Sequence, residues 1–234
     1  MSRNWIATMM GWRRFSMNSI PSYSAVVLAA GQGTRTGLAY NKVFYRLPEG
    51  CTVLEGALRP FLMDAACRQI VVTAHPGEME EVQALVQDPR IRVVAGGDSR
   101  QDSVRQALEA VTEPVVFIHD GARPYLQNRE LEKLKDVMTR EKAALLAVPV
   151  TDTIKEVHEG RITGTPDRRF LYAAQTPQAF DTELIRSCHE AACEQGALVT
   201  DDCMLAEQFG GVQVAVVESD PGNRKITTPA DLEQ

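Results

Sequence analysis

Val26-Val27-Leu28-Ala29-Ala30-Gly31-Gln32-Gly33-Thr34-Arg35 is an apolar run that leads directly into a glycine-rich loop, and Lys42 follows seven residues after Arg35. Glycine turns tightly and lets phosphate oxygens reach the backbone N–H groups, because it has no Cβ. Arg35 adds a planar fork of hydrogen-bond donors, and Lys42 adds a mobile point charge. The stretch therefore predicts a buried strand followed by a loop that binds a triphosphate.

The glycine spacing separates this loop from two common nucleotide-binding motifs. A Rossmann dinucleotide fingerprint has the form G-x-G-x-x-G, whereas Gly31, Gly33 and Gly37 put the third glycine one position late. A P-loop of the form G-x-x-x-x-G-K-[ST] does not occur in the chain. Taken alone, the loop also fits a plain strand-to-helix turn whose glycines only permit positive φ.

The overall composition is that of an acidic globular protein. The chain has 234 residues, 44% of them hydrophobic, which suffices for one large α/β domain or two small ones. Lys and Arg number 25 against 31 Asp and Glu, a net charge of −6 that argues against a nucleic-acid-coating protein. No apolar run approaches the ~18 residues of a membrane span. We therefore expect neither nucleic acid nor a membrane as a partner.

Residues 1–22 differ from the rest of the chain. They contain both tryptophans and three arginines, and no acidic residue precedes Glu49. They have no apolar core of the kind that a secretory signal needs. We expect an N-terminal tail, disordered or produced by a start assigned too early, with Met17 as the alternative start. An ordered arm and a transit-like peptide, which would direct the protein to a plastid, are the other interpretations.

The five cysteines form no C-x-x-C pair. An odd number of cysteines without metal-ligand spacing predicts reduced thiols in a cytoplasmic protein. His189 and Cys193 would share one helix face, but no second pair of ligands accompanies them, so we expect no metal there.

Strand and helix patterns alternate along residues 23–234, which we take as a single domain. Continuous apolar runs typical of strands buried on both faces cover residues 25–28, 69–74, 91–95, 114–119, 143–150 and 212–217. Helical patterns cover residues 53–63, 78–86, 103–110, 131–139 and 182–194. This alternation predicts a mainly parallel, three-layer α/β/α sheet of Rossmann-like type. Ligands bind beyond the carboxyl ends of such strands, where the glycine loop, Gly96 to Asp98 and Asp120 to Arg123 all fall.

Residues 151–172 interrupt the alternation. Thr153 to Val157 and Ile162-Thr163 are typical of two short strands, with a turn at His158 to Arg161. An isolated polar hairpin is marginally stable. We therefore expect a protruding β-hairpin arm that packs against a second copy of the chain and forms a homodimer; a surface excursion without a partner is the alternative.

Several separated motifs occur in one order along residues 24–234. They are Ala29-Ala30-Gly31-Gln32-Gly33-Thr34-Arg35, Lys42, Gly96-Gly97-Asp98-Ser99-Arg100-Gln101-Asp102-Ser103, His119-Asp120-Gly121-Ala122-Arg123-Pro124, Pro149-Val150-Thr151-Asp152-Thr153-Ile154-Lys155, Asp167-Arg168, Gln175-Thr176-Pro177-Gln178, Thr200-Asp201-Asp202 and Asn223-Arg224-Lys225-Ile226-Thr227-Thr228-Pro229. In this order they resemble the nucleotidyltransferases of the glycosyltransferase-A-like fold. The resemblance is closest to the 2-C-methyl-D-erythritol 4-phosphate cytidylyltransferase family of the non-mevalonate isoprenoid pathway.

The resemblance implies an enzyme that joins CTP to a polyol phosphate, 2-C-methyl-D-erythritol 4-phosphate, to give 4-diphosphocytidyl-2-C-methyl-D-erythritol and pyrophosphate. The acceptor's phosphate would attack the α-phosphorus of CTP in line. A phosphate monoester is mostly dianionic in neutral solution because its second pKa is about 6, so no general base is required. Two anions must meet and a third must leave, so catalysis would depend on positioning, cations and Mg²⁺.

The resemblance also assigns roles to single residues. The catalytic cations would be Arg35, Lys42 and Lys225. CTP would be bound by Ala29, Ala30, Gly31, Gly33, Gly97, Asp98, Ser103 and Asp120. The acceptor would be bound by Asp120, Arg123, Thr153, Arg168 and Lys225. Thr153 and Arg168 would act in the neighbouring subunit's site, and Asp120 is the candidate ligand of Mg²⁺.

Some of these motif residues also have plainer interpretations. Arg123 fits a strand exit, and His119 fits a packed core imidazole rather than an acid. Asp201 and Asp202 fit a helix cap after Thr200 as well as a ligand contact.

The chain departs from the family pattern at three positions near the expected site. Thr36 stands where the family usually has methionine after the loop arginine. Asn41 stands in place of the usual proline before Lys42, which puts the rigidity of the loop in question. Arg224 stands in place of the isoleucine of an Asn-Ile-Lys segment and adds a cation there.

Other functions remain open on the sequence alone. D-Ribitol 5-phosphate cytidylyltransferases share the fold and most motifs, and the segment from Asp167 to Gln175 favours the methylerythritol type. The Gly-Gly-Asp and hairpin segments disfavour a nucleotidyltransferase for the molybdenum cofactor, and the glycine spacing disfavours a dehydrogenase. A non-catalytic nucleotide-binding module would be expected to have lost some of the charged motif residues, all of which are present.

Overall fold

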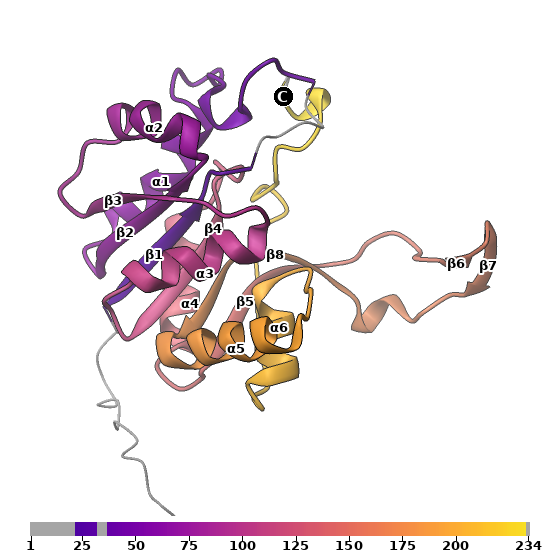
Figure 1. Ribbon diagram of the computed structural model, residues 1–234. Coiled ribbons are helices and arrows are strands. Elements are labelled where there is room, and N and C mark those ends of the chain that lie inside the picture. The colour runs from indigo at the N-terminus through magenta and orange to yellow at the C-terminus, as the bar shows by residue number, and fades with distance from the viewer. Residues whose placement is uncertain (1–21, 32–36, 233–234) are drawn as a thin grey trace, which may run out of the picture.

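The computed structural model describes residues 22–31 and 37–232. A seven-stranded sheet with the order β3-β2-β1-β4-β8-β5-β9 lies at the centre, with helices on both faces, and a two-stranded hairpin projects from the body (Figure 1). β8 is antiparallel to both of its neighbours, and the other pairings in the sheet are parallel. The predicted mainly parallel three-layer sheet is confirmed.

Each predicted strand and helix overlaps an element of the structure. The strands are β1 Tyr23–Leu28, β2 Cys67–Ala74, β3 Ile91–Ala95, β4 Val115–Asp120, β5 Ala143–Pro149, β6 Glu156–His158, β7 Arg161–Gly164, β8 Tyr172–Asp181 and β9 Ala215–Glu218. The α-helices are α1 Val53–Met63, α2 Met79–Leu85, α3 Arg100–Ala110, α4 Asn128–Val137, α5 Thr182–Gln195 and α6 Asp202–Phe209. Short 3₁₀ helices are η2 Lys42–Phe44, η3 Pro76–Glu78, η4 Arg168–Phe170 and η5 Pro229–Leu232. Among these described helices, none is long and apolar enough to cross a membrane.

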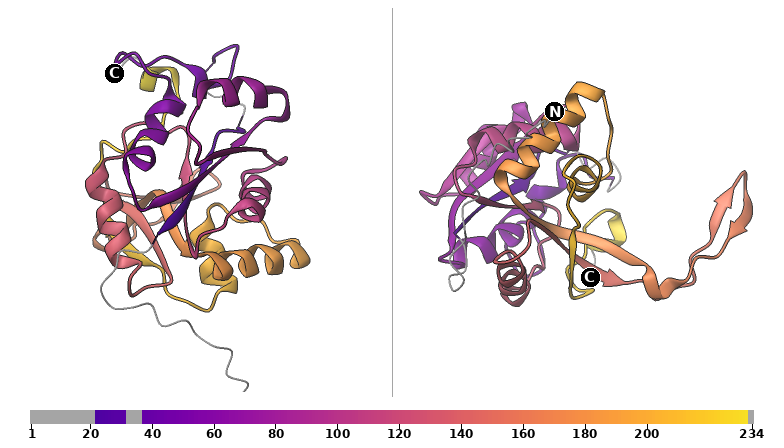
Figure 2. Two further views of the ribbon diagram at one scale, coloured as in Figure 1. Left: turned by 90° about the vertical axis from the view of Figure 1, so that its left-hand side faces the viewer. Right: turned by 90° about the horizontal axis from the view of Figure 1, so that it is seen from below.

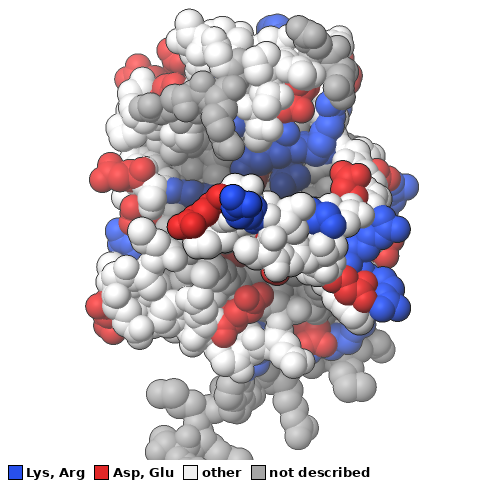
Figure 3. Space-filling model, turned by 90° about the vertical axis from the view of Figure 1, so that its right-hand side faces the viewer, with Lys and Arg blue, Asp and Glu red and all other residues white. Residues whose placement is uncertain are grey.

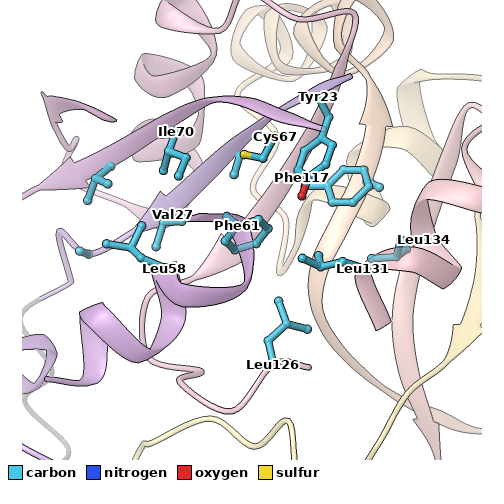
Figure 4. Packing of buried hydrophobic residues seen from close by; sticks show 14 of the residues in the cluster. Tyr23, Val27, Leu58, Phe61, Cys67, Ile70, Phe117, Leu126, Leu131 and Leu134 are labelled. Atoms are coloured by element: carbon cyan, nitrogen blue, oxygen red, sulfur yellow. The ribbon is translucent and has the colours of Figure 1, made fainter. Parts of the chain in front are cut away.

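Helices lie on both faces of the sheet (Figure 2). Each face is covered by its own hydrophobic cluster. Ala25 and Val27 of β1 belong to the cluster under α1, α2 and α4, whereas Val26 between them belongs to the cluster under α3, α5 and α6. Successive side chains of a strand point to opposite faces, so a strand buried on both sides has a continuous apolar sequence. In the first cluster the ring of Tyr23 stacks on that of Phe117, with 4.2 Å between centroids (Figure 4).

Strand β8 was missed because its sequence does not have the pattern of a central strand. It contains Pro177, which cannot donate to a strand ladder. The pairing of β8 with β5 is irregular at this point, because the register shifts between Leu145 and Ala147. The proline lies in this irregular stretch, where a regular ladder bond is not needed.

The predicted hairpin is present, as β6 and β7, and it extends away from the body of the protein (Figure 1). Strand β6 begins at Glu156 rather than at Thr153. Apolar side chains on the arm have little cover, with Val157, Ile162 and Phe170 exposed by 60%, 65% and 79%. Most of the surface of these three apolar side chains is therefore exposed in the single chain.

The register between β1 and β4 sets the place of the site. Leu28, the last residue of β1, lies opposite Asp120, the last residue of β4. The Gly121 N–H donates to the Leu28 carbonyl oxygen at 2.9 Å, and a Cβ at Gly121 would lie only 2.7 Å from that oxygen. Glycine is thus required where the chain leaves β4, and the glycine loop starts beside Asp120.

Candidate functional site

A cleft of about 710 Å³ opens at the carboxyl ends of β1 to β4, and we call it the edge cleft. Most of the residues predicted to bind or catalyse line it, namely Ala29, Ala30, Gly31, Lys42, Gly97, Asp98, Ser103, Asp120 and Lys225. On the face from which the arm projects, Lys and Arg side chains gather in a hollow, as an anion site requires (Figure 3). A second cleft of about 830 Å³, between α1, α4 and the segment before Lys225, contains none of the predicted residues.

One wall of the edge cleft is the turn between β3 and α3. The Ser103 hydroxyl accepts from the Gly97 N–H at 3.1 Å and donates to the Ser99 carbonyl oxygen at 2.9 Å. A Cβ on Gly97 would lie 2.4 Å from the Cβ of Asp102, so this turn has no room for a side chain. This part of the wall is therefore a tightly packed turn held by the Ser103 hydroxyl, with the N-terminus of α3 at its edge.

Asp120 lies in the cleft among three cations. The Lys225 Nζ is 2.8 Å and the Arg123 Nε is 3.7 Å from its Oδ2, and the Arg100 Nε is 3.6 Å from its Oδ1. Burial raises the pKa of the Asp120 carboxyl, but the charges of Lys225, Arg100 and Arg123 outweigh it and hold that pKa well below its usual range. Asp120 is therefore a permanent carboxylate at neutral pH.

His119 belongs to the core and not to the cleft. It is fully buried, its Nε2 lies 3.1 Å from the Arg123 carbonyl oxygen, and its Nδ1 lies 3.0 Å from the Thr176 hydroxyl. The same hydroxyl accepts from the Asp120 N–H at 2.9 Å. Burial lowers the pKa of His119 to about 4. The interpretation of His119 as a packed imidazole is confirmed, and it helps to fix the backbone at Asp120.

Lys42 is 8% exposed, and its Nζ donates to the Ile226 carbonyl oxygen at 2.8 Å. The residue before it, Asn41, donates to the Ala29 carbonyl oxygen at 3.1 Å and to Glu78 Oε2 at 2.8 Å. Its side-chain oxygen also accepts from the Val43 N–H at 3.3 Å. Asn41 thus anchors Lys42 to the end of β1 by hydrogen bonds, which answers the question raised by the missing proline.

The segment that carries Lys225 is fixed on both sides. Asn223 is fully buried, and its amide nitrogen donates to Gln175 Oε1 at 3.1 Å and to the Thr176 carbonyl oxygen at 2.9 Å. On the other side, the Asp231 carboxylate accepts from the backbone N–H and hydroxyl groups of Thr227 and Thr228. Lys225 is therefore held at the cleft by contacts on both sides of it in the sequence.

The arrangement brings the cations Lys42 and Lys225 together with the carboxylate of Asp120, and the described residues of the cleft include no paired nucleophile and base, which suits transfer between phosphates. A sequence profile of the 2-C-methyl-D-erythritol 4-phosphate cytidylyltransferase family (IspD) matches residues 23–234. The chain belongs to this family.

Relatives and solved structures agree with the assignment. The chain is 42% identical over 215 residues to the 2-C-methyl-D-erythritol 4-phosphate cytidylyltransferase of Bacillus velezensis, with 90% of this chain and 92% of the relative covered. It is equally identical over 215 residues to that of Halalkalibacterium halodurans, with 90% and 93% covered. The crystal structure of 4-diphosphocytidyl-2C-methyl-D-erythritol synthase from Anaerococcus prevotii is similar with a TM-score of 0.83 and 30% identity, with 93% of this chain and 95% of that one covered.

Not every residue predicted from the cytidylyltransferase family lies in the edge cleft. Arg123 lies beside it, where its Nη1 donates to the Asn223 carbonyl oxygen at 2.8 Å. Thr153 and Arg168 lie in the exposed arm, and the Arg168 guanidinium donates to the Thr151 carbonyl oxygen at 2.6 Å. Arm residues do not line this subunit's own cleft.

Gly33, Arg35 and Thr36 lie outside the described part of the chain, as do Gln32 and Thr34 of the glycine loop. Residues 1–21, which contain Met17 and nearly all of the predicted N-terminal tail, lie outside it too.

Asp201 and Asp202 have different roles. Asp201 is the N-cap of α6 and accepts from the Met204 N–H at 3.0 Å, so the capping interpretation is confirmed for it. Asp202 instead pairs with Arg100 of α3, with 2.8 Å between Oδ2 and Nη2. His189 lies beside Asp202, with 3.4 Å between Nε2 and Oδ1.

The sequence motifs include Arg100, but no role was predicted for it. Its position along the helix is the one feature of the sequence that could have indicated a role. Arg100 is the first residue of α3, where the helix macrodipole disfavours a cation. A cation at this position indicates that nearby carboxylates hold it.

The residues of the cleft fit a magnesium–nucleotide complex. The described residues include no cluster of three or more His, Cys, Asp or Glu side chains that could hold a metal by themselves. Mg²⁺ bound with a nucleotide usually takes only one or two carboxylates, because phosphate oxygens and water supply the rest. Asp120 is an ionised carboxylate, and its Oδ1 lies beyond hydrogen-bond distance of Arg100 Nε, at 3.6 Å.

The lowered pKa of His119 predicts one source of acid sensitivity. The folded protein keeps His119 neutral down to a pKa of about 4, whereas the unfolded chain takes up the proton near the ordinary 6.5. This contribution to the free energy of unfolding is complete above pH 6.5 and is lost as the pH falls toward 4, by at most roughly 1.4 kcal/mol per pH unit. We expect His119→Gln to give a shallower pH dependence than the parent in denaturant titrations across this window. If the free energy of unfolding depends equally steeply on pH in the two proteins, His119 is not a source of the acid sensitivity.

Proposed function

We propose that the chain transfers CMP from CTP to 2-C-methyl-D-erythritol 4-phosphate, giving 4-diphosphocytidyl-2-C-methyl-D-erythritol and pyrophosphate in isoprenoid precursor biosynthesis. The observation that carries the proposal is the edge cleft, in which Lys42, Lys225 and Asp120 meet beside the start of the glycine loop. The five cysteines are free thiols, which supports a cytoplasmic location.

The chemistry is a displacement at phosphorus. An oxygen of the acceptor's phosphate forms a bond to the α-phosphorus of CTP, and the bond from that phosphorus to the bridging oxygen of the β-phosphate breaks. The electron pair leaves with pyrophosphate. Because the attacking phosphate is already mostly dianionic, with a second pKa of about 6, no side chain has to remove a proton. The buried His119 is consistent with this, since its ring nitrogens face Thr176 and a backbone carbonyl.

The main task of the protein is to neutralise and align three anionic groups: the acceptor's phosphate, the α-phosphate of CTP and the departing pyrophosphate. Lys42 approaches the cleft from η2 and Lys225 from the C-terminal segment, so the two ammonium groups reach the reacting phosphates from different elements. We assign the phosphates of CTP to these lysines, to Arg35, and to the backbone of the loop. The loop positions are Ala29, Ala30, Gly31 and Gly33.

We assign the cytidine to the slot between β3 and α3. Gly97, Asp98 and Ser103 line it. A narrow slot edged by backbone groups and a hydroxyl can read a pyrimidine by hydrogen bonds and exclude a purine by size.

We assign Mg²⁺ to Asp120, together with phosphate oxygens of CTP. When bound, the ion would neutralise phosphate charge and fix the geometry of the triphosphate. Asp120 contributes an ionised carboxylate whose backbone N–H is held by Thr176.

The acceptor is assigned to Asp120, Arg123 and Lys225 in one subunit and to Thr153 and Arg168 from the arm of a second subunit. Two observations support this homodimer. The arm extends from the body with exposed apolar side chains, and its cation Arg168 is not among the described residues that line the edge cleft of its own subunit. A partner that covers the arm would bury Val157, Ile162 and Phe170.

The choice of acceptor is tested by pyrophosphate release from the purified protein with CTP and Mg²⁺. We expect release with 2-C-methyl-D-erythritol 4-phosphate and none with D-ribitol 5-phosphate. Release with ribitol phosphate alone would keep the chemistry and change the substrate. If neither acceptor gives pyrophosphate release while CTP still binds, the result would support a non-catalytic nucleotide-binding module.

Lys42→Ala tests the catalytic cation. We expect the turnover rate to fall by about 100-fold or more, because a preorganised charge at a developing anion typically contributes this much. Lys133→Ala is the matched control, since Lys133 is exposed on α4 and donates to the Glu218 carbonyl oxygen. Retention of more than about a tenth of the parent rate by a folded Lys42→Ala protein would remove Lys42 from the catalytic groups.

Arg168→Ala tests the shared site. We expect a higher KM for the acceptor with little change in CTP binding. At an acceptor concentration far below the raised KM, where Arg168→Ala alone is nearly inactive, mixing Arg168→Ala subunits with Lys42→Ala subunits should restore about a quarter of the parent activity, because half of the dimers are mixed and each has one intact site. A mixture of Lys42→Ala with Lys225→Ala should stay inactive, since both changes affect the same half of the site. If the first mixture stays as inactive as the second, the arm does not act in the partner's site.

A further inference from the structure

Arg100 joins two carboxylates that come from different layers of the fold. From the start of α3, its Nη2 contacts Asp202 Oδ2 of α6 at 2.8 Å, and its Nε lies 3.6 Å from Asp120 Oδ1 at the end of β4. A guanidinium has donors on several edges of one rigid plane, so it can face two anions in fixed relative positions. The Arg100 side chain is 31% exposed, on the wall of the edge cleft.

Asp202 is a rigid partner for Arg100. Its side chain is 1% exposed, and its backbone N–H donates to Gln178 Oε1 of β8 at 3.1 Å. Its Oδ1 lies 3.4 Å from Nε2 of His189 on α5, which is equally buried. Burial raises the pKa of the Asp202 carboxyl, and the charge of Arg100 outweighs it, so this pKa lies below its ordinary value. The buried carboxylate therefore depends on Arg100 for its charge balance.

The other contacts of Asp120 are on one side of its carboxylate. Lys225 and Arg123 both face Oδ2, and Arg100 faces Oδ1. Without Arg100, rotation about the Cβ–Cγ bond would allow both oxygens to turn toward the two other cations. Lys225 would then be paired more tightly with Asp120 and would be less available to a phosphate.

We propose that Arg100 is a positioning residue, which holds the Asp120 carboxylate in its working orientation and is itself held by the buried Asp202. The proposal rests on the proposed function, because it explains how the carboxylate and Lys225 stay ready for the transfer. It assigns Asp202 a role that acts through Arg100 alone. Helices α5 and α6, which lie outside the cleft, are thereby joined to the reacting groups.

The first test compares Arg100→Ala, Arg100→Lys and the parent in steady-state kinetics and in calorimetric titration with CTP. For Arg100→Ala we expect kcat to fall at least about tenfold, with the Kd for CTP nearly unchanged. Arg100→Lys should recover thermal stability and not kcat, because a single ammonium cannot face both carboxylates in fixed positions. Arg105→Ala is the matched control, since Arg105 lies on the same helix and its nearest acidic partner, Glu109, is exposed.

The second test is a double-mutant cycle with Asp202→Asn. If Asp202 acts only through Arg100, kcat should fall in Asp202→Asn, and the double variant should be no slower than Arg100→Ala alone. Unfolding temperatures of all variants separate loss of fold from loss of rate. Additive losses in kcat would contradict the link between Asp202 and Arg100.

Two further results would overturn the proposal. An unchanged kcat in a folded Arg100→Ala protein would mean that Asp120 keeps its orientation without Arg100. A large loss of CTP affinity with little change in kcat would make Arg100 a nucleotide contact instead. An inactive parent protein would refute the proposed function itself, so the two failures are distinguishable.

Discussion

Parallel pairing of β1 with β4 is the constraint on which the site depends. It sets Leu28 opposite Asp120, so the glycine loop and the carboxylate that pairs with Lys225 start from adjacent strand ends. Residues separated by about ninety positions in the sequence thus meet without any bend of either strand. Gly121 makes this possible, because the hydrogen bond from its N–H to Leu28 leaves no space for a Cβ.

The chain's C-terminal segment completes the site from the opposite direction. Lys42 donates to Ile226, and Lys225 contacts Asp120, so the segment both supplies a cation and holds one. Its own position comes from buried Asn223 and from Asp231 at the end of the described chain. The packing of Leu232 with Ile226 in a small hydrophobic cluster strengthens this arrangement. The departures at Asn41 and Arg224 are accommodated, the first by three hydrogen bonds and the second by contact of its guanidinium with the Tyr125 ring.

The sequence predicted the sheet well because strands buried on both faces, such as β4 with its run from Val115 to Ile118, have an unbroken apolar pattern. It predicted the cleft because residues that follow parallel strands meet at one edge, as the glycine loop and Asp120 do. It failed for β8, where Pro177 conceals a central strand. The link between Arg100 and Asp202 was also beyond it, because a contact between α3 and α6 depends on how two helices pack and leaves no periodic pattern.

Lys42 is nearly buried, and its ammonium group already donates to the Ile226 carbonyl oxygen. This lowers the conformational entropy that the side chain can still lose when a ligand binds. A free lysine side chain has up to ~2 kcal/mol of rotamer entropy to lose when it is ordered. Here folding has removed that freedom, so a phosphate that binds Lys42 as we propose would exchange partners with an ammonium that is already in place. The association should therefore have a smaller entropic penalty at this lysine than a surface lysine would give, and the exchange of a carbonyl oxygen for a phosphate oxygen should appear mainly as enthalpy.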